Sequence, residues 1–283
     1  MTNTKLQIRI MTREELNTIM DWAAAEGWNP GFFDANCFYS ADSTGFLIGT
    51  VNDEPVASIS VVKYGKSFGF LGFYIVKPEY RGKGYGLQIW NAGIEYLEDR
   101  NIGLDGVVNQ QDNYIRSGFK LAYKNIRYEG SKTINSIDNK DIIDLSTIPF
   151  NTFEKFDRQL FPDSRTQFIS CWINQPSHKA LGIKYKNKLV GYGVIRKCRI
   201  GYKIGPLFAI TPDLAEKLFQ ALISKVKPGD PYYIDVPEIN GAAIIMVQKY
   251  NMKKVFETAR MYTNEVPDID LNKVFGVTSF ELG

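Results

Sequence analysis

A glycine-rich turn between a strand and a helix is the segment of this chain with the clearest chemical meaning. An apolar strand predicted over 67–76 leads into Arg81-Gly82-Lys83-Gly84-Tyr85-Gly86, and an amphipathic helix is predicted over 84–100. Such a turn directs main-chain N–H groups and the positive end of the helix dipole at one small volume, which favours an anion. The three glycines leave no Cβ between the main chain and that anion. The turn therefore predicts a phosphate-bearing partner.

Two common phosphate motifs do not fit this turn. A P-loop needs Ser or Thr directly after its lysine, and Gly84 follows Lys83. The dinucleotide fingerprint fits Gly82 and Gly84 but requires a third glycine where Leu87 stands. It also requires alternating strands and helices, whereas three strands joined by short turns are predicted over 45–76. A glycine turn that serves tight packing alone remains the structural alternative.

Composition and charge exclude several classes of protein. The 283 residues carry 34 basic and 31 acidic side chains, so the net charge of +3 does not indicate binding to nucleic acid. No apolar stretch approaches the ~18 residues of a membrane span, and the polar N-terminus lacks a signal-peptide core. We therefore expect a cytoplasmic protein without nucleic-acid or membrane partners.

The cysteines and the single histidine do not indicate a metal site. Cys37, Cys171 and Cys198 are widely spaced and match no metal-ligand pattern, so all three are interpreted as small packed side chains. His178 is the only histidine, which excludes a catalytic triad or a histidine cluster elsewhere. It falls in a predicted loop, and we expect it to have no chemical role.

The chain repeats one order of elements twice. In the first half strands are predicted over 7–11, 45–51, 56–62, 67–76, 104–108 and 119–128, and helices over 12–25, 84–100 and 112–117. In the second half strands are predicted over 180–186, 189–197, 199–210, 232–236 and 253–263, and helices over 214–225 and 240–250. Pro78 and Pro212 lie 134 residues apart, and Gly118 and Asn251 lie 133 apart. The nearly constant offset indicates a structural duplication.

The two halves differ at the glycine turn. The matching segment of the second half is Ala215-Glu216-Lys217-Leu218-Phe219-Gln220, which favours a helix and offers no glycine cradle. One half is therefore expected to hold the phosphate. The polar segment 130–140 is the predicted boundary between the halves.

Residues 73–86, F-Y-I-V-K-P-E-Y-R-G-K-G-Y-G, closely resemble the acetyl-coenzyme A motif of the GNAT superfamily of N-acetyltransferases. The likeness extends to Asn113-Tyr114-Ile115-Arg116-Ser117-Gly118-Phe119, which is similar to the family's tyrosine placed before Gly-Phe. The whole chain resembles a two-domain subgroup. This resemblance implies an α/β (α+β) fold with a catalytic GNAT domain over 1–130 and a degenerate GNAT-like domain over 131–283. Each domain is expected to be a mixed, mostly antiparallel twisted sheet flanked by helices.

The resemblance also implies acetyl-CoA as the cofactor and a set of residues that bind it. In the family the fourth strand bulges away from its neighbour, and its amides bind the pantetheine arm. The residues expected to contact acetyl-CoA are Ile75, Val76, Arg81, Gly82, Lys83, Gly84, Tyr85, Gly86, Asn109 and Asn113. The side chains of Arg81 and Lys83 can equally be solvated surface groups. The spacing of the two asparagines departs from the family pattern.

Transfer of an acetyl group from a thioester needs a polarised carbonyl and a proton for the leaving thiolate. By resemblance, the N–H of Val76 is expected to stabilise the oxyanion. Tyr114 is expected to protonate the sulfur, because a phenol with a pKa near ~10 is protonated at neutral pH. A packed aromatic ring is the alternative interpretation of Tyr114. No general base is recognisable in the sequence.

The acceptor is expected to be a primary amine of a small molecule. Trp22, Glu26, Trp28 and Asp235 are the predicted substrate-binding residues, because tryptophans and carboxylates suit a cationic or aromatic amine. The tryptophans can instead fill core, Glu26 can end a helix, and Asp235 can belong to a solvated strand end. A non-catalytic acyl-CoA sensor and a protein N-acetyltransferase are the alternative functions, and the sequence gives no oligomeric state.

Overall fold

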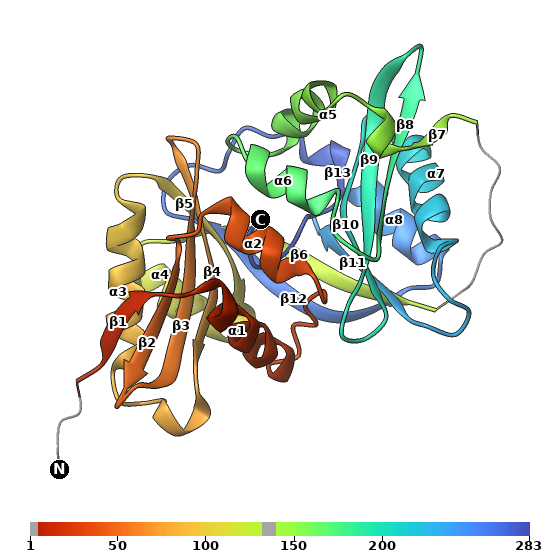
Figure 1. The fold of residues 1–283 in the computed structure, drawn as a ribbon. Coiled ribbons are helices and arrows are strands. Elements are labelled where there is room, and N and C mark those ends of the chain that lie inside the picture. The colour runs from red at the N-terminus through yellow and green to blue at the C-terminus, as the bar shows by residue number, and fades with distance from the viewer. Residues whose placement is uncertain (1–4, 132–139) are drawn as a thin grey trace.

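The computed structural model describes residues 5–131 and 140–283, and in these residues thirteen strands form one continuous mixed sheet (Figure 1). The strands follow the order β1-β2-β3-β4-β5-β12-β6-β11-β10-β9-β8-β7, and β13 pairs with β10 beside this path. The pairs β4/β5 and β10/β11 are parallel, and the other pairs are antiparallel. The predicted mixed sheet with flanking helices is confirmed. The predicted boundary segment lies outside the described residues except for 130, 131 and 140.

Both halves contain the predicted elements. The first half comprises β1 (Gln7–Ile10), α1 (Arg13–Ala25), α2 (Asp34–Ala41), β2 (Phe46–Val51), β3 (Glu54–Tyr64), β4 (Phe68–Val76), α3 (Tyr85–Leu97), β5 (Asn101–Val107), α4 (Gln111–Arg116) and β6 (Lys120–Gly130). The second comprises β7 (Ile142–Asp144), α5 (Phe150–Asp157), α6 (Thr166–Trp172), β8 (His178–Tyr185), β9 (Lys188–Lys197), β10 (Tyr202–Ala209), α7 (Pro212–Ile223), β11 (Tyr232–Pro237), α8 (Gly241–Lys249), β12 (Lys253–Tyr262) and β13 (Val274–Gly276).

Local signals explain why these helices begin where they do. Thr12 caps α1, and its hydroxyl accepts from the N–H of Glu15 while the Glu15 carboxylate accepts from the N–H of Thr12. Thr211 caps α7, where its side chain accepts from the N–H of Leu214 and Pro212 stands in the first turn. Asn240 caps α8 by accepting from the N–H of Ala243 at 3.0 Å. The capping prediction for Thr12 and Glu15 is confirmed.

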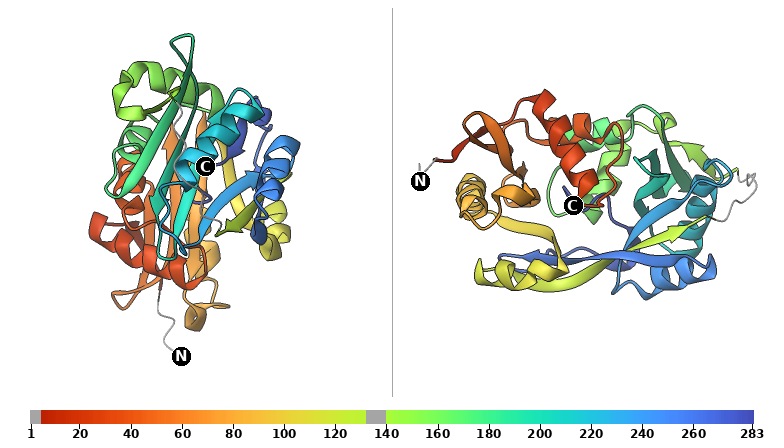
Figure 2. Two further views of the ribbon diagram at one scale, coloured as in Figure 1. Left: turned by 90° about the vertical axis from the view of Figure 1, so that its right-hand side faces the viewer. Right: turned by 90° about the horizontal axis from the view of Figure 1, so that it is seen from below.

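The two halves exchange their closing strands. β12 from the second half lies between β5 and β6, and β6 from the first half lies between β12 and β11. The right-hand view of Figure 2 shows β6 and β12 running side by side from one half to the other. Each half therefore completes the sheet of the other. The sheet is continuous for this reason, whereas the sequence indicates two separate sheets.

Each exchanged strand carries a buried arginine that pairs with an aspartate on the other half. On β12, Arg260 lies opposite Asp105 of β5, and its Nε and Nη2 donate to the carboxylate at 3.0 and 2.5 Å. On β6, Arg127 lies opposite Asp235 of β11, with distances of 2.6 and 2.8 Å. The two pairs occupy equivalent positions of the repeat. Bidentate contacts of this kind fix the register of the strands as well as neutralising the charges.

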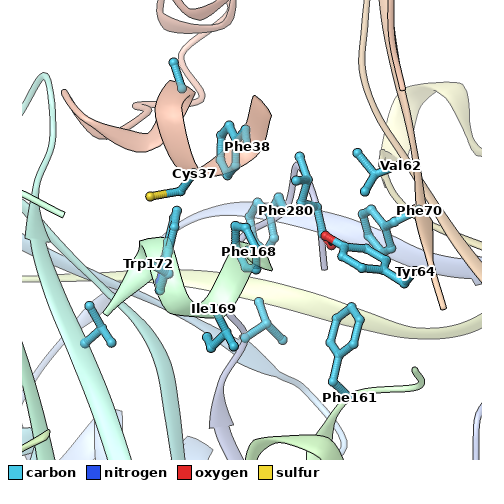
Figure 3. Packing of buried hydrophobic residues seen from close by; sticks show 14 of the residues in the cluster. Cys37, Phe38, Val62, Tyr64, Phe70, Phe161, Phe168, Ile169, Trp172 and Phe280 are labelled. Atoms are coloured by element: carbon cyan, nitrogen blue, oxygen red, sulfur yellow. The ribbon is translucent and has the colours of Figure 1, made fainter. Parts of the chain in front are cut away.

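Helices α2 and α6 meet at equivalent positions where the halves face each other. The ring of Phe38 stacks on Trp172 at 5.7 Å and on Phe168 at 6.3 Å, and Figure 3 shows these side chains converging with Phe280. A disulfide joins Cys37 to Cys171 across the same junction, with a separation of 134 residues that equals the repeat offset. The interpretation of all three cysteines as packed thiols is therefore wrong for these two. Cys198 is a free, buried thiol.

We predict that Arg260→Met lowers the free energy of unfolding by about 3–5 kcal/mol, because it leaves the buried Asp105 without its cationic partner. Urea unfolding followed by circular dichroism measures the change. The control is Lys254→Met on the same strand, whose exposed pair with Glu257 is worth at most about 1 kcal/mol. Equal stability of the two variants would contradict the role given to the exchanged strand.

Candidate active site

Strands β4 and β5 separate part-way along their length. They pair from Phe68 opposite Asn101 to Leu71 opposite Leu104, and not beyond. A bulge in β4 accompanies the separation, because Phe73 and Tyr74 together lie opposite one residue of β3. Phe73 has a left-handed φ of 45°, and its carbonyl accepts from the Ser58 hydroxyl at 2.8 Å. The bulge leaves a wedge-shaped opening beside the end of β4.

The main chain of Val76 faces this opening. The N–H of Lys77 donates to the carbonyl of Val56 on β3 at 3.0 Å. Because successive residues of a strand direct their main-chain groups to opposite sides, Val76 directs its N–H and C=O away from β3. Nε of Arg81 donates to the Val76 carbonyl at 2.8 Å. By the same alternation, the main-chain groups of Ile75 face β3.

The glycine turn joins β4 to the N-terminus of α3. Gly82 and Gly84 have φ values of 75° and 79°, a left-handed conformation that glycine adopts without strain. A Cβ at either position would meet no atom within 4 Å, so the space in front of both is open. Gly86 differs, because a Cβ there would lie 2.6 Å from the hydroxyl of Tyr74. The turn thus combines an open cradle with a helix N-terminus, which suits an anion.

The two basic side chains of the turn have different surroundings. Arg81 forms an ion pair with Glu26 at 2.6 Å, so the turn is linked to the segment after α1. Nζ of Lys83 lies 4.7 Å from the centre of the Tyr80 ring. Both predicted phosphate contacts by these side chains stay predictions.

A cavity of about 680 Å³ occupies the opening and extends between the halves. The first half lines it with the end of β4, the glycine turn, the end of β5 and α4. The second half contributes Phe256 and Thr258 of β12 and the residues Phe280 and Glu281. The exchanged strand therefore brings side chains of the second half to the site.

Nine of the predicted site residues line this cavity: Glu26, Trp28, Ile75, Val76, Arg81, Gly82, Gly86, Asn109 and Tyr114. The others lie outside its lining. Trp22 is half-buried beneath Nζ of Lys77, and Asn113 donates to Gln110 at 2.6 Å. Lys83, Gly84 and Tyr85 belong to the turn and the start of α3. Asp235 is buried in its pair with Arg127 and does not line the cavity.

Tyr114 lies at the wall of the cavity, with 7% of its surface exposed. Its ring stacks on Trp90 at 5.7 Å. Gly106 makes room for it, because a Cβ there would lie 2.2 Å from the ring. Burial raises the pKa of Tyr114 to about 12, and the neighbouring Tyr74 adds to the increase. The phenol therefore keeps its proton at neutral pH and can donate it.

The equivalent opening of the second half is filled by the chain itself. β10 and β11 pair from Tyr202 to Ile204 and then separate, as β4 and β5 do. β13 enters this space and pairs with Leu207 and Phe208 of β10, and the N–H of Val277 donates to the carbonyl of Asp235 on β11. β13 and Val277 thus occupy the place that the open wedge has in the first half, which fits the lack of a glycine turn at 215–220.

Several residues of the cavity are missed by sequence reasoning. Phe256, Thr258, Phe280 and Glu281 come from the second half, and no local pattern places them beside β4. Gly72 marks the place where the chain of the second half crosses β4, but a single glycine in a strand does not predict such a crossing. A Cβ at Gly72 would lie 2.1 Å from the carbonyl of Glu281, so this glycine lets the segment 277–283 cross β4.

Comparisons with known proteins identify the family. Residues 12–116 match the model of the acetyltransferase (GNAT) family, and residues 153–276 match an acetyltransferase (GNAT) domain. The chain is 33% identical over 272 residues to holothin acyltransferase from Pseudoalteromonas sp. (strain SANK 73390). The aligned residues cover 95% of this chain and 92% of that protein. The chain belongs to the GNAT acyltransferase family. It is an acyltransferase of two tandem GNAT domains, as the sequence predicts.

Solved structures share the fold of this GNAT acyltransferase. A putative acetyltransferase from Pyrococcus horikoshii matches with a TM-score of 0.83 at 20% identity, over 98% of this chain and 96% of that one. A tandem GNAT protein from the clavulanic acid biosynthesis pathway matches with a TM-score of 0.62 at 11% identity, over 93% and 100%. Within residues 5–131 and 140–283, no helix is both long and apolar enough to cross a membrane.

The residues present fit an acyl-CoA, the acyl donor that this family uses. The cradle at Gly82 and Gly84 is open and lies at a helix N-terminus, where a diphosphate would be held. The main chain of Val76 faces the same opening, and Tyr114 lines it. The donor would supply the thioester. The glycine turn and the main chain of Val76 would bind and orient it, and Tyr114 would protonate the leaving thiolate.

We predict that Gly84→Asp weakens binding of coenzyme A at least 10-fold, about 1.4 kcal/mol, because the carboxylate would repel the diphosphate. Isothermal titration calorimetry measures the affinity. Gly229→Asp is the matched control, since Gly229 also has a positive φ, 91°, and open space around it. Unchanged affinity in Gly84→Asp, or equal loss in both variants, would count against the cradle.

We predict that Tyr114→Phe lowers kcat about 100-fold and leaves the affinity for coenzyme A unchanged, because the phenol acts on the leaving thiolate. The pKa of Tyr114 is raised to about 12. Its neutral form therefore persists as the pH rises, and we expect no loss of wild-type kcat through its ionisation below pH ~10. Thiol release measured between pH 6 and pH 10 tests both points. Tyr202→Phe on β10 is the control. If Tyr114→Phe kept the kcat of the wild type, Tyr114 would not be the residue that protonates the thiolate.

Proposed function

We propose that this GNAT acyltransferase transfers an acetyl group from acetyl-CoA to a primary amine of a small molecule. The observation that carries the proposal is the cavity of about 680 Å³ that both halves line. Because this volume must hold the reactive end of the donor as well as the acceptor, it suits a small molecule, whose sites span about 300–1,000 Å³. A protein acceptor would need an open groove.

The proposed roles divide between the halves. Residues 1–130 hold the donor, with the glycine turn at the diphosphate, the Val76 N–H at the oxyanion and Tyr114 at the sulfur. Residues 131–283 shape the acceptor end through β12 and the segment 277–283. Trp28 and Glu26 line the same cavity from the first half, and we assign them to the acceptor side. The name of the Pseudoalteromonas relative states acyl transfer, which supports the reaction type.

An amine panel tests the proposal. The purified chain is incubated with acetyl-CoA and small primary amines, and thiol release is measured together with the mass of the product. We expect at least one small amine to gain an acetyl group faster than peptides or proteins do. Longer acyl-CoA donors, run in parallel, test the preference for acetyl. Binding of acetyl-CoA with no transfer to any amine would contradict the proposal, as would faster transfer to proteins.

A further inference from the structure

Glu281 is a buried carboxylate with an oxygen that has no partner. Glu281 is one of the residues that line the cavity, only 3% of its surface is exposed, and its buried Oε1 accepts no hydrogen bond. The other deeply buried carboxylates are each paired with an arginine: Asp34, Asp105, Asp157 and Asp235. A buried acceptor without a donor costs free energy. Glu281 therefore differs from every structural carboxylate around it.

The segment that carries Glu281 is held firmly in place. β13 fills the opening of the second half, and the chain then crosses β4 at Gly72, one residue after the last pair between β4 and β5. Tyr64 donates to the carbonyl of Leu282 at 3.0 Å, and the N–H of Leu282 donates to the Ser279 hydroxyl at 3.1 Å. The segment that leaves the filled opening of the second half thus brings Glu281 to the lining of the cavity.

The surroundings of Glu281 suit a cation on an apolar frame. Phe73, Phe256, Phe280 and Trp28 line the same cavity, and aromatic rings attract cations as a carboxylate does. Three cations are close enough for Glu281 to raise their pKa values: Arg127, Arg196 and Lys203. Asp235 and Asp34 form the ion pairs of the two arginines, and Nζ of Lys203 donates to the Trp28 carbonyl at 3.3 Å. Oε1 of Glu281 thus takes part in none of these hydrogen bonds.

We propose that Glu281 binds the ammonium group of the acceptor and removes its proton, and that the acceptor is a compact amine on an apolar or aromatic frame. This inference rests on the proposed function. One proton passes from R–NH3⁺ to the carboxylate, and the freed lone pair forms the C–N bond as the C–S bond breaks. Tyr114 gives its proton to the sulfur and regains one from the amide nitrogen. Glu281 then releases its proton to solvent.

The variant Glu281→Gln tests this role through its dependence on pH. At pH 7 we expect kcat/KM for an alkylamine to fall about 100-fold. The deficit should shrink as the pH approaches the pKa of the amine, because water then supplies the neutral form. Arg127 and Arg196 stay charged over that range. Burial lowers the pKa of Lys203 and raises the pKa of Cys198. Both groups are present in the wild type and in the variant, so their titration cancels in the ratio.

Three comparisons make the test decisive. Glu257→Gln on β12, which does not line the cavity, should keep the wild-type kcat/KM within 2-fold, and Glu281→Asp should recover part of the loss at pH 7. Glu281→Gln should keep its melting temperature and its affinity for coenzyme A. A deficit that is constant with pH, full activity at pH 7, or failure to fold would overturn the role of Glu281 while acyl transfer by the wild type stands. No transfer by the wild type would overturn the proposed function itself.

Discussion

Two buried ion pairs, Arg127 with Asp235 and Arg260 with Asp105, are the interactions on which this architecture depends. They fix the exchanged strands β6 and β12 in register, each against a strand of the other half. Removing one partner leaves an unpaired charge in the interior, which lowers the free energy of unfolding far more than replacing both partners by apolar side chains does. Because the strands are exchanged, the sheet is continuous and both halves face one cavity. The exchange brings Phe256 and Thr258 of β12 to that cavity.

The duplication also allows the two halves to be compared, and they differ in whether the wedge between the parallel strands is open. Both halves separate their two parallel strands, which opens a wedge. In the first half the wedge is free and ends at a glycine turn with an open cradle. In the second half β13 fills it, and the N-terminus of α7 is capped by Thr211. The filled wedge is still useful, since the chain that leaves it carries Phe280 and Glu281 into the cavity.

Local chemistry made much of this predictable from sequence. The glycine turn, the cap of α1 by Thr12 and the repeat offset depend on neighbouring residues, and the structure contains all three. The exchange of β6 and β12 cannot be predicted from neighbouring residues, because each strand could also pair with a strand of its own half. The sequence predicts Asp235 at a strand end near the acceptor, but in the structure it lies within β11 and pairs with Arg127, 108 residues away, and it does not line the cavity. The disulfide between Cys37 and Cys171 and the position of Glu281 also depend on residues far apart in the chain, so the sequence does not predict them.

Hydrogen–deuterium exchange of the full chain, with and without coenzyme A, tests the central claim most directly. That claim is that the donor lies in the open wedge of the first half, held by main-chain groups. Coenzyme A should slow exchange at the amides of Val76 and of residues 82–87, and leave residues 204–208 and 212–216 unchanged. Protection in the second half, or none at the glycine turn, would contradict the account.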